Sequence, residues 1–366
     1  MNKRITSIDA LRGADMLLLA GGGAILAGLA RWGDAPALHR QLTHAAWGQP
    51  LTCWDMVMPL FIFIVGAGMP FAFAKYRSSG ASVGRILWRV GRRCVCLFLL
   101  GMLVQGNLAS ADPSQMSLFC NTLQAIAEGY LIAAICLLCG GVRSQLAVCF
   151  GCLLLYWAAL RFVPYAGHEG GRFLPYDNLA IWIDRSLQGR WQDGTPYSWI
   201  LTSLAFGALT LLGVLGGQII RLCSGRLRSI GLLVAAAAVC LIAGRLLALD
   251  TPIIKHIFTA SMVLYSAGWC FALLALFHAL FDTTARTAPL SKPLIIFGTN
   301  AILAYLLTQT PGMGHHSLWY TLTFPLFGGL SSLAGSLAAP VFSLLSFLAL
   351  FFLLSFLHSH KIYLRV

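Results

Sequence analysis

A histidine and an aspartate lie close together in the chain, where an apolar segment begins, and their side chains could move protons. His44 precedes Trp47 in a short polar stretch, and Asp55 lies in the first turn of the apolar run that continues to Gly66. Imidazole is suited to proton transfer near neutral pH, and ionisable groups at a membrane span are costly unless they serve a function. We predict His44 as a general base oriented by Asp55. The structural alternatives are an interfacial histidine and a carboxylate at a helix N-terminus.

We expect membrane-spanning helices to hold this pair in place. Hydrophobic residues make up 58% of the 366 residues and charged residues only 10%, and the mean hydropathy of +0.78 excludes a water-soluble globular protein. A span needs roughly 20 apolar residues. We therefore predict an all-α polytopic membrane protein with about ten spans. The expected spans are 13–31, 54–74, 94–110, 118–140, 145–163, 198–220, 230–248, 257–281, 293–309 and 336–357.

The basic residues predict the orientation of these spans. If Met1 lies in the cytoplasm, 17 of the 25 Lys and Arg residues fall on the cytoplasmic side and eight on the outer face or at span ends. The positive-inside rule then places both termini in the cytoplasm. The formal charge of +13 is thus mainly a topology signal, and its scatter through short loops gives no support for a nucleic-acid partner. The first apolar run lacks a small-residue cleavage site, so we expect this span to be retained.

We expect one transmembrane domain over residues 1–366. Residues 1–140 form the half that contains the His44 loop, and residues 141–366 form the half that contains the outer loop 164–197. The other long outer loops are expected at 32–53 and 310–335. Loop 164–197 combines glycine, aromatic and polar residues, among them Trp182 and Asp184. Aromatic faces stack on sugar rings while carboxylates bind hydroxyl groups, so this composition suits a carbohydrate ligand. An interfacial aromatic belt is the alternative.

Further polar residues are expected at membrane depth, where they indicate a polar cavity. Asp15 lies inside the first span, and Gln124 and Glu128 are one helical turn apart in the fourth. Lys255, near the outer end of the eighth span, could neutralise a substrate carboxylate or extend to the interface. Two cysteines have CxxC spacing but lie in an apolar run with no second pair, so we predict no metal site.

Several motifs resemble a known family in the order in which they occur. The chain resembles the catalytic domain of heparan-alpha-glucosaminide N-acetyltransferase and its bacterial relatives over about residues 4–305. The matching segments are residues 4–13, Gly21-Gly22-Gly23, 44–66, Leu123-Gln124-Ala125-Ile126 with Tyr130, 178–180 with Ile183-Asp184-Arg185, Pro252 with Lys255, 261–264, and Pro293 with 297–301. The chain departs from the family pattern at Leu19, Ile254 and Phe258.

The resemblance implies a transmembrane acyltransferase in the bacterial inner (cytoplasmic) membrane. Such a protein takes an acetyl group from cytoplasmic acetyl-CoA and delivers it to an amino sugar or other glycan acceptor on the periplasmic side. His44 matches the family's active-site histidine, and because of the departures another polar group, such as Asn300, could take the orienting role. The expected substrate-binding residues are Trp47, Gln124, Glu128, Asp184 and Lys255. Whether N- or O-acetylation occurs, and whether the chain forms a homodimer, stays open.

Acetyl-CoA is the expected co-substrate, and three features of the sequence could bind it. Asp15 suggests a cavity open to the cytoplasm. Gly21, Gly22 and Gly23 permit the approach of a thin pantetheine arm, or simply close helix packing. Four arginines of a short basic helix in the cytoplasmic connection 75–93 could bind the coenzyme phosphates or anionic lipid: Arg85, Arg89, Arg92 and Arg93.

Two mechanisms and two other functional classes stay open. We expect direct transfer with both substrates bound, because one imidazole can deprotonate an acceptor poised against the thioester. An acetyl-histidine relay is the competing mechanism. A secondary transporter of a small polar or sugar-like solute also has about ten spans and intramembrane charges, and a non-catalytic anchoring subunit would not need His44.

Overall fold

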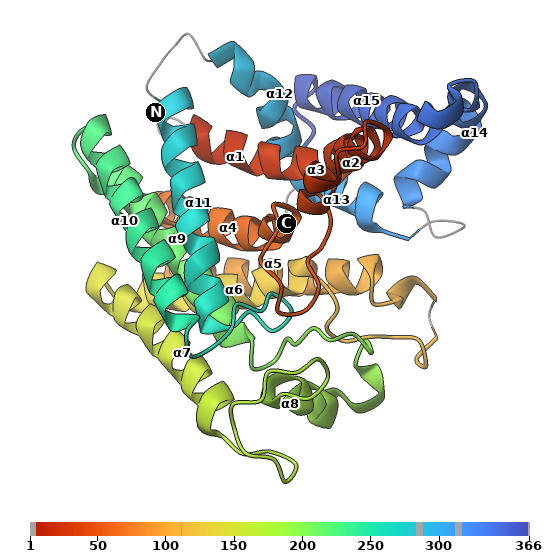
Figure 1. The fold of residues 1–366 in the computed structure, drawn as a ribbon. Helices are drawn as coiled ribbons and strands as arrows, with labels where there is room; N and C mark the ends of the chain where they lie inside the picture. The colour runs from red at the N-terminus through yellow and green to blue at the C-terminus, as the bar shows by residue number, and fades with distance from the viewer. Residues whose placement is uncertain (1–4, 111, 283–287, 312–316, 365–366) are drawn as a thin grey trace. The chain divides into compact units, whose positions relative to one another are not determined.

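The computed structural model describes residues 5–110, 112–282, 288–311 and 317–364, which form helices and no β-strand (Figure 1). The all-α prediction is therefore confirmed. The longer helices are α1 (Thr6–Leu17), α2 (Gly23–Trp32), α4 (Val57–Ser78), α5 (Val83–Val104), α6 (Thr122–Cys139), α7 (Val142–Phe162), α8 (Leu179–Gln188), α9 (Ser203–Leu222), α10 (Arg226–Leu247), α11 (Ala260–Phe281), α12 (Ala288–Thr299), α13 (Ala301–Gln309), α14 (Leu318–Ser332) and α15 (Ala338–Ser359). Short elements are η1 (Leu18–Gly22), α3 (Pro36–Gln41), η2 (Trp54–Met56), η3 (Leu108–Ser110), η4 (Gly189–Trp191) and η7 (Gly335–Leu337).

Eight helical segments within the described residues are long and apolar enough to cross a membrane. They are Thr6–Trp32, Trp54–Ser78, Thr122–Cys139, Val142–Phe162, Ser203–Leu222, Arg226–Leu247, Ala260–Phe281 and Gly335–Ser359. Helices α12 and α13 together would make a ninth, and they bend by 63° at the residue between them, Asn300. The chain is thus a multi-pass membrane protein.

The expected third span, residues 94–110, is not among these segments. The arginines that we expected in a short loop helix and the apolar residues that follow them form one continuous helix, α5. Ser82 caps its start by accepting a hydrogen bond from the backbone N–H of Arg85, and no proline follows before Val104. The arginines make α5 less apolar than the other long helices. Similarly, the expected loop 310–335 contains α14.

Contacts group the chain into two compact units, described separately below. Unit 1 consists of residues 1–45, 51–57 and 277–365, and unit 2 of residues 46–50 and 58–276. These units are groups of residues in contact, and they do not correspond to the expected functional halves 1–140 and 141–366. The two halves stay a prediction.

In unit 2, glycines bring α4 and α9 into backbone contact. Gly213 and Gly217 are four residues apart on α9, so they lie on one face. A Cβ atom at Gly213 would lie 2.0 Å from the carbonyl oxygen of Phe63, and one at Gly217 would lie 2.1 Å from that of Ala67. From the other side, a Cβ at Gly66 would lie 2.0 Å from the carbonyl oxygen of Thr210. This is the close approach that small residues four apart allow between membrane helices.

In unit 1, helix α1 packs in the same manner against α12. A Cβ at Gly13 would lie 1.7 Å from the carbonyl oxygen of Leu294, and one at Gly298 would lie 2.3 Å from that of Asp9. The first apolar segment is interrupted at the triple glycine, where η1 forms a π-helical turn and Gly21 adopts φ 137°. Only glycine adopts such a φ without strain, and single π turns recur at functional sites. The glycines thus separate α1 from α2.

Candidate functional site

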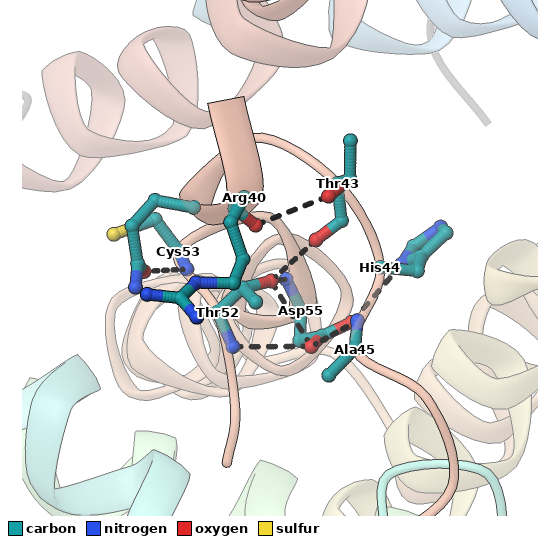
Figure 2. Close-up of polar contacts among 8 residues, drawn as sticks. Arg40, Thr43, His44, Ala45, Thr52, Cys53 and Asp55 are labelled. Carbon is teal, nitrogen blue, oxygen red and sulfur yellow. Dashed lines mark hydrogen bonds and ion pairs between the residues drawn. The ribbon is translucent and has the colours of Figure 1, made fainter. Parts of the chain in front are cut away.

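The carboxylate of Asp55 is the centre of a small hydrogen-bonded loop in unit 1 (Figure 2). Its Oδ2 accepts hydrogen bonds from the backbone N–H groups of Thr52 and Ala45, both at 3.1 Å, and lies 3.0 Å from the Thr52 hydroxyl. Asp55 is only 1% exposed. The hydroxyl of Thr52 also lies 2.7 Å from the carbonyl oxygen of Thr43, so it joins both sides of the loop. These contacts fix the carboxylate before any ligand binds.

His44 is held by the remaining carboxylate oxygen. Its Nδ1 lies 3.0 Å from Oδ1 of Asp55, while 56% of its side chain is exposed. A carboxylate only accepts hydrogen bonds, so Nδ1 is the donor in this contact, and in the neutral tautomer with the proton on Nδ1 the lone pair is on Nε2. The arrangement gives an oriented imidazole that can accept a proton at Nε2. These are the two residues that the sequence singled out.

Trp54 connects this loop to the triple glycine. Its ring lies against Gly23, where a Cβ atom would be 2.2 Å from Cζ3 of the indole. The same indole meets the imidazole of His44 edge-on, with ring centroids 6.3 Å apart. The absence of a side chain at Gly23 therefore makes room for the tryptophan that touches His44. The sequence predicts coenzyme binding or helix packing at Gly21, Gly22 and Gly23, and at Gly23 the structure shows packing against Trp54.

Asp15 lies in α1 and is 2% exposed. Among the described residues, its Oδ2 has no hydrogen-bond partner. A buried carboxyl oxygen of this kind is costly unless water or a ligand satisfies it. Its expected role in coenzyme binding stays a prediction.

Asn300 is engaged with the C-terminal segment. It lies between α12 and α13 and is 1% exposed. Its Nδ2 donates to the carbonyl oxygen of Ile362 at 3.2 Å, and its Oδ1 accepts from the backbone N–H of Leu364 at 3.3 Å. The structure thus shows Asp55, and not Asn300, bonded to the ring of His44.

The four arginines lie in the first half of α5. Arg85, Arg89 and Arg92 are exposed. The guanidinium of Arg89 lies over the ring of Tyr76 at 5.2 Å, and that of Arg93 over the ring of Tyr130 at 4.5 Å. Such cation–π contacts orient a guanidinium without removing its positive charge. The four arginines therefore lie on α5 (Val83–Val104), a longer helix than the short one that the sequence predicts.

The expected substrate residues Trp47 and Lys255 lie in unit 2. The indole of Trp47 donates to the carbonyl oxygen of Phe173 at 2.8 Å and stacks on His256, with ring centroids 5.1 Å apart. Lys255 is 7% exposed and belongs to a tight turn in which its carbonyl oxygen accepts from the N–H of Phe258. The structure therefore brings Trp47 close to the residue that follows Lys255.

Gln124 and Glu128 differ although both lie on α6. The amide of Gln124 caps the helix: its Oε1 accepts from the N–H groups of Cys120 and Asn121, and its Nε2 donates to Leu118. Oε2 of Glu128, in contrast, is buried and has no hydrogen-bond partner among the described residues. Gln124 has a structural use, whereas Glu128 retains hydrogen-bonding capacity.

Asp184 on α8 is buried and ties two segments together. Its Oδ2 and Oδ1 accept from the backbone N–H groups of Trp199 and Ile200, at 2.7 and 3.0 Å. Burial raises the pKa of this carboxyl to about 7, although the two N–H donors act in the opposite direction. Asp184 therefore ties α8 to the residues that follow loop 164–197.

A second His–Asp pair escaped the sequence analysis. Nδ1 of His278 lies 2.8 Å from Oδ2 of Asp282 in unit 1, and Oδ1 of Asp282 accepts from the backbone N–H of Ser7 at 3.2 Å. The sequence criterion that selects His44, a carboxylate at the start of the span that follows, does not apply to His278, which lies at the end of a span. The i, i+4 spacing of His278 and Asp282 at the end of a span was the signal that could have found the pair.

Comparison with known proteins gives one result. Residues 4–181 match a family model described as a domain of unknown function, DUF5009. The match runs from the start of α1 into α8, so it includes the His44–Asp55 loop, and its description assigns no activity. No curated protein matches the chain. Fold and site together define a multi-pass helical membrane protein with an oriented His–Asp pair, similar to this family over those residues.

Proposed function

We propose that this chain is an integral membrane acyltransferase. It moves an acetyl group from cytoplasmic acetyl-CoA to an amino sugar or other glycan acceptor on the periplasmic side of the bacterial inner membrane. The observation that supports this most is the 3.0 Å contact between Nδ1 of His44 and the buried carboxylate of Asp55. The sequence resemblance described above, in which His44 matches the active-site histidine, points to the same residue.

In the proposed reaction, His44 acts as a general base in direct transfer. The acceptor amine attacks the thioester carbonyl carbon, the new N–C bond forms and the C–S bond breaks. Nε2 takes the proton from the amine and passes it to the leaving thiolate, which departs as the free thiol. Asp55 keeps Nδ1 protonated and stabilises the imidazolium that forms in between, and base catalysis of this kind contributes about 10²–10⁴-fold.

The proposal includes a topology of about ten spans with both termini in the cytoplasm. The eight apolar segments, the bent pair α12–α13 and α5 would account for ten. The arginines of α5 would then lie on the cytoplasmic side, where they could bind the phosphates of the coenzyme.

A transfer assay on the reconstituted protein tests the proposal. Purified full-length chain in proteoliposomes is given acetyl-CoA labelled in the acetyl group, with glucosamine as acceptor. Label in the sugar supports the enzyme, and its loss in His44→Ala assigns the histidine. Ping-pong kinetics with a trapped acetyl-enzyme would replace direct transfer by the relay. No labelled product with any amino sugar or glycan acceptor would contradict the activity.

One observation favours a secondary transporter as the second candidate. Helices α12 and α13 form a broken pair with a 63° bend and a buried asparagine at the break, and discontinuous helices line substrate sites in transporters. Uptake of unmodified labelled glucosamine into the same vesicles without acetyl-CoA would support transport over acetyl transfer.

A further inference from the structure

The break between α12 and α13 divides a segment that has the length of one membrane span. At about 1.5 Å per residue, α12 is about 18 Å long and α13 about 14 Å, so neither alone crosses a hydrocarbon core of about 30 Å. As one straight helix, α12, Asn300 and α13 would measure about 33 Å. The two helices bend by 63° instead. The bend therefore controls how far this segment reaches.

No residue at the break forces the bend. The nearest proline, Pro293, lies inside α12, more than one turn before Asn300. Gly298 permits a bend but does not impose one. Asn300 has φ −118° and ψ 32°, and because its φ is negative it can rotate to helical values without entering the left-handed region. Contacts from elsewhere in the chain must therefore hold the two helices bent.

Residues 360–364, which we call the strap, are turned sharply as they leave α15. The helix ends in a Schellman motif, in which the N–H of Ile362 donates to the carbonyl oxygen of Leu357 at 2.8 Å and that of Lys361 to the carbonyl oxygen of His358 at 3.1 Å. Lys361 adopts φ 57°, a conformation that glycine adopts most readily. The end of α15 thus sets the direction of the strap.

The strap is bonded to the break through its own backbone. Asparagine is a favoured N-cap residue, yet the side chain of Asn300 does not cap α13. Its amide bonds the carbonyl oxygen of Ile362 and the N–H of Leu364 instead. Beside it, Oγ1 of Thr299 lies 3.1 Å from Nδ1 of His358. All these residues belong to unit 1, and together they fix the break to the end of α15.

The helices on either side of the break are held to different degrees. Helix α12 is fixed on α1 by the glycine contacts described above, and on α15 through the ring of Phe297, which stacks on that of Phe347 at 5.4 Å. Of the residues of α13, all of which the structure describes, two are buried, Ala304 and Tyr305. Helix α13 is therefore the element whose direction can change.

We propose that the strap keeps α12 and α13 bent, and that its release lets α13 swing into line with α12. In the strapped state, the amide of Asn300 bonds residues 362 and 364. In the released state, Asn300 joins one continuous helix, whose length matches the hydrocarbon core. This switch goes beyond the proposed function and does not depend on it, because it rests on contacts between helices and backbone in unit 1.

Hydrogen exchange at residues 301–303 of the purified full-length chain tests the strap, measured at single residues by mass spectrometry. These are first-turn amides of α13, since the N–H of Ala304 makes the first intrahelical bond, to Asn300. Joining α12 would give each a carbonyl partner. Leu364→Pro removes the N–H that bonds Asn300 and should slow their exchange about tenfold or more. Leu364→Ala keeps this N–H and should exchange like the wild type.

Two further variants test the direction of the effect. Ending the chain at His360 removes most of the strap and should slow exchange at residues 301–303 at least as much as Leu364→Pro does. Lys361→Gly favours the turn that directs the strap and should leave exchange there as fast as in the wild type, or faster. Exchange of α9, which lies in unit 2, reports on global unfolding and should be the same in every variant.

Three results would overturn the strap. The first is unchanged exchange at residues 301–303 in both Leu364→Pro and the truncated chain. The second is faster exchange throughout α13 in these variants, because the strap would then hold α13 folded and not bent. The third is equal slowing in Leu364→Ala, which would assign the effect to the leucine side chain. If the exchange differences appear but no acetyl transfer occurs, the strap stands and the proposed enzymatic function fails.

Discussion

At the scale of single residues, the two members of the His44–Asp55 pair have different environments and different expected roles. Asp55 is buried and collects its donors from Ala45 and Thr52, whereas most of the His44 side chain is exposed. Stability should therefore depend on the aspartate and proton transfer on the histidine.

This difference gives the first prediction. Asp55→Ala leaves the buried N–H of Thr52 without its acceptor and should cost about 2–4 kcal/mol of stability, because bonds to charged groups are strong and unsatisfied donors are costly. His44→Ala should cost less than about 1 kcal/mol but reduce acetyl transfer by about 10² or more. Thermal unfolding and the transfer assay measure the two effects. The exposed carboxylate variant Glu169→Ala serves as control, and normal turnover in His44→Ala would remove His44 from the mechanism.

Asp184 gives a prediction about pH. Its pKa is raised to about 7 by burial, from 3.8 in the ordinary case. The folded protein therefore holds this proton more tightly than the unfolded chain, and the stabilisation is complete below about pH 4 and lost as pH rises towards 7. Hydrogen exchange of residues 179–200 should be slower at pH 5 than at pH 8, after correction for the intrinsic rates. In Asp184→Asn the exchange should be faster overall and should no longer depend on pH in this way; equal dependence in both proteins would show that another group is responsible.

At the scale of secondary-structure elements, the contact between α4 and α9 depends on the glycines of α9. Gly213→Ala or Gly217→Ala would force a Cβ atom into the carbonyl oxygen of Phe63 or Ala67. We expect each to destabilise unit 2 by about 1–3 kcal/mol through overpacking. Gly231→Ala on α10 is the matched control, because no atom lies within 4 Å of a Cβ there, and it should be neutral or slightly stabilising. Thermal unfolding in detergent compares the three, and equal effects at all three positions would contradict the backbone contact.

The elements also show where sequence reasoning succeeds and where it ends. Apolar runs in the sequence predict the helices. His44 and Asp55 are only eleven residues apart, so a loop that leads directly into a helix can bring their side chains together. The sequence pattern does not predict the continuity of α5, because the residues up to Arg93 are basic and those after it are apolar. This change in hydropathy does not interrupt the backbone hydrogen bonds of a helix, so α5 continues through it. The bonds of Asp184 to the backbone of Trp199 and Ile200 are tertiary contacts, for which no periodic pattern exists in the sequence.

At the scale of the whole molecule, the basic residues predict that both termini face the cytoplasm. A reporter that is active only in the periplasm, fused after Val366, should be inactive, and a reporter active only in the cytoplasm should be active. Cysteine labelling from outside supplies an independent readout: a probe that does not cross membranes should modify exposed Cys53 and should not modify a cysteine introduced at Gly84, which lies beside Arg85 at the start of α5. Periplasmic activity of the terminal fusion would contradict the topology.

The make-up of unit 1 from both ends of the chain sets an order of events during synthesis. The His44–Asp55 loop can close once the first sixty or so residues have left the ribosome, since its partners are neighbours in the chain. Gly13 must wait for Leu294, about 280 residues later, which at 5–20 residues per second is roughly 15–60 s. Throughout that interval the glycine face of α1 meets lipid or the insertion machinery instead of α12. A nascent chain stalled before α12 would therefore carry a closed His44–Asp55 loop while α1 has not yet packed against α12.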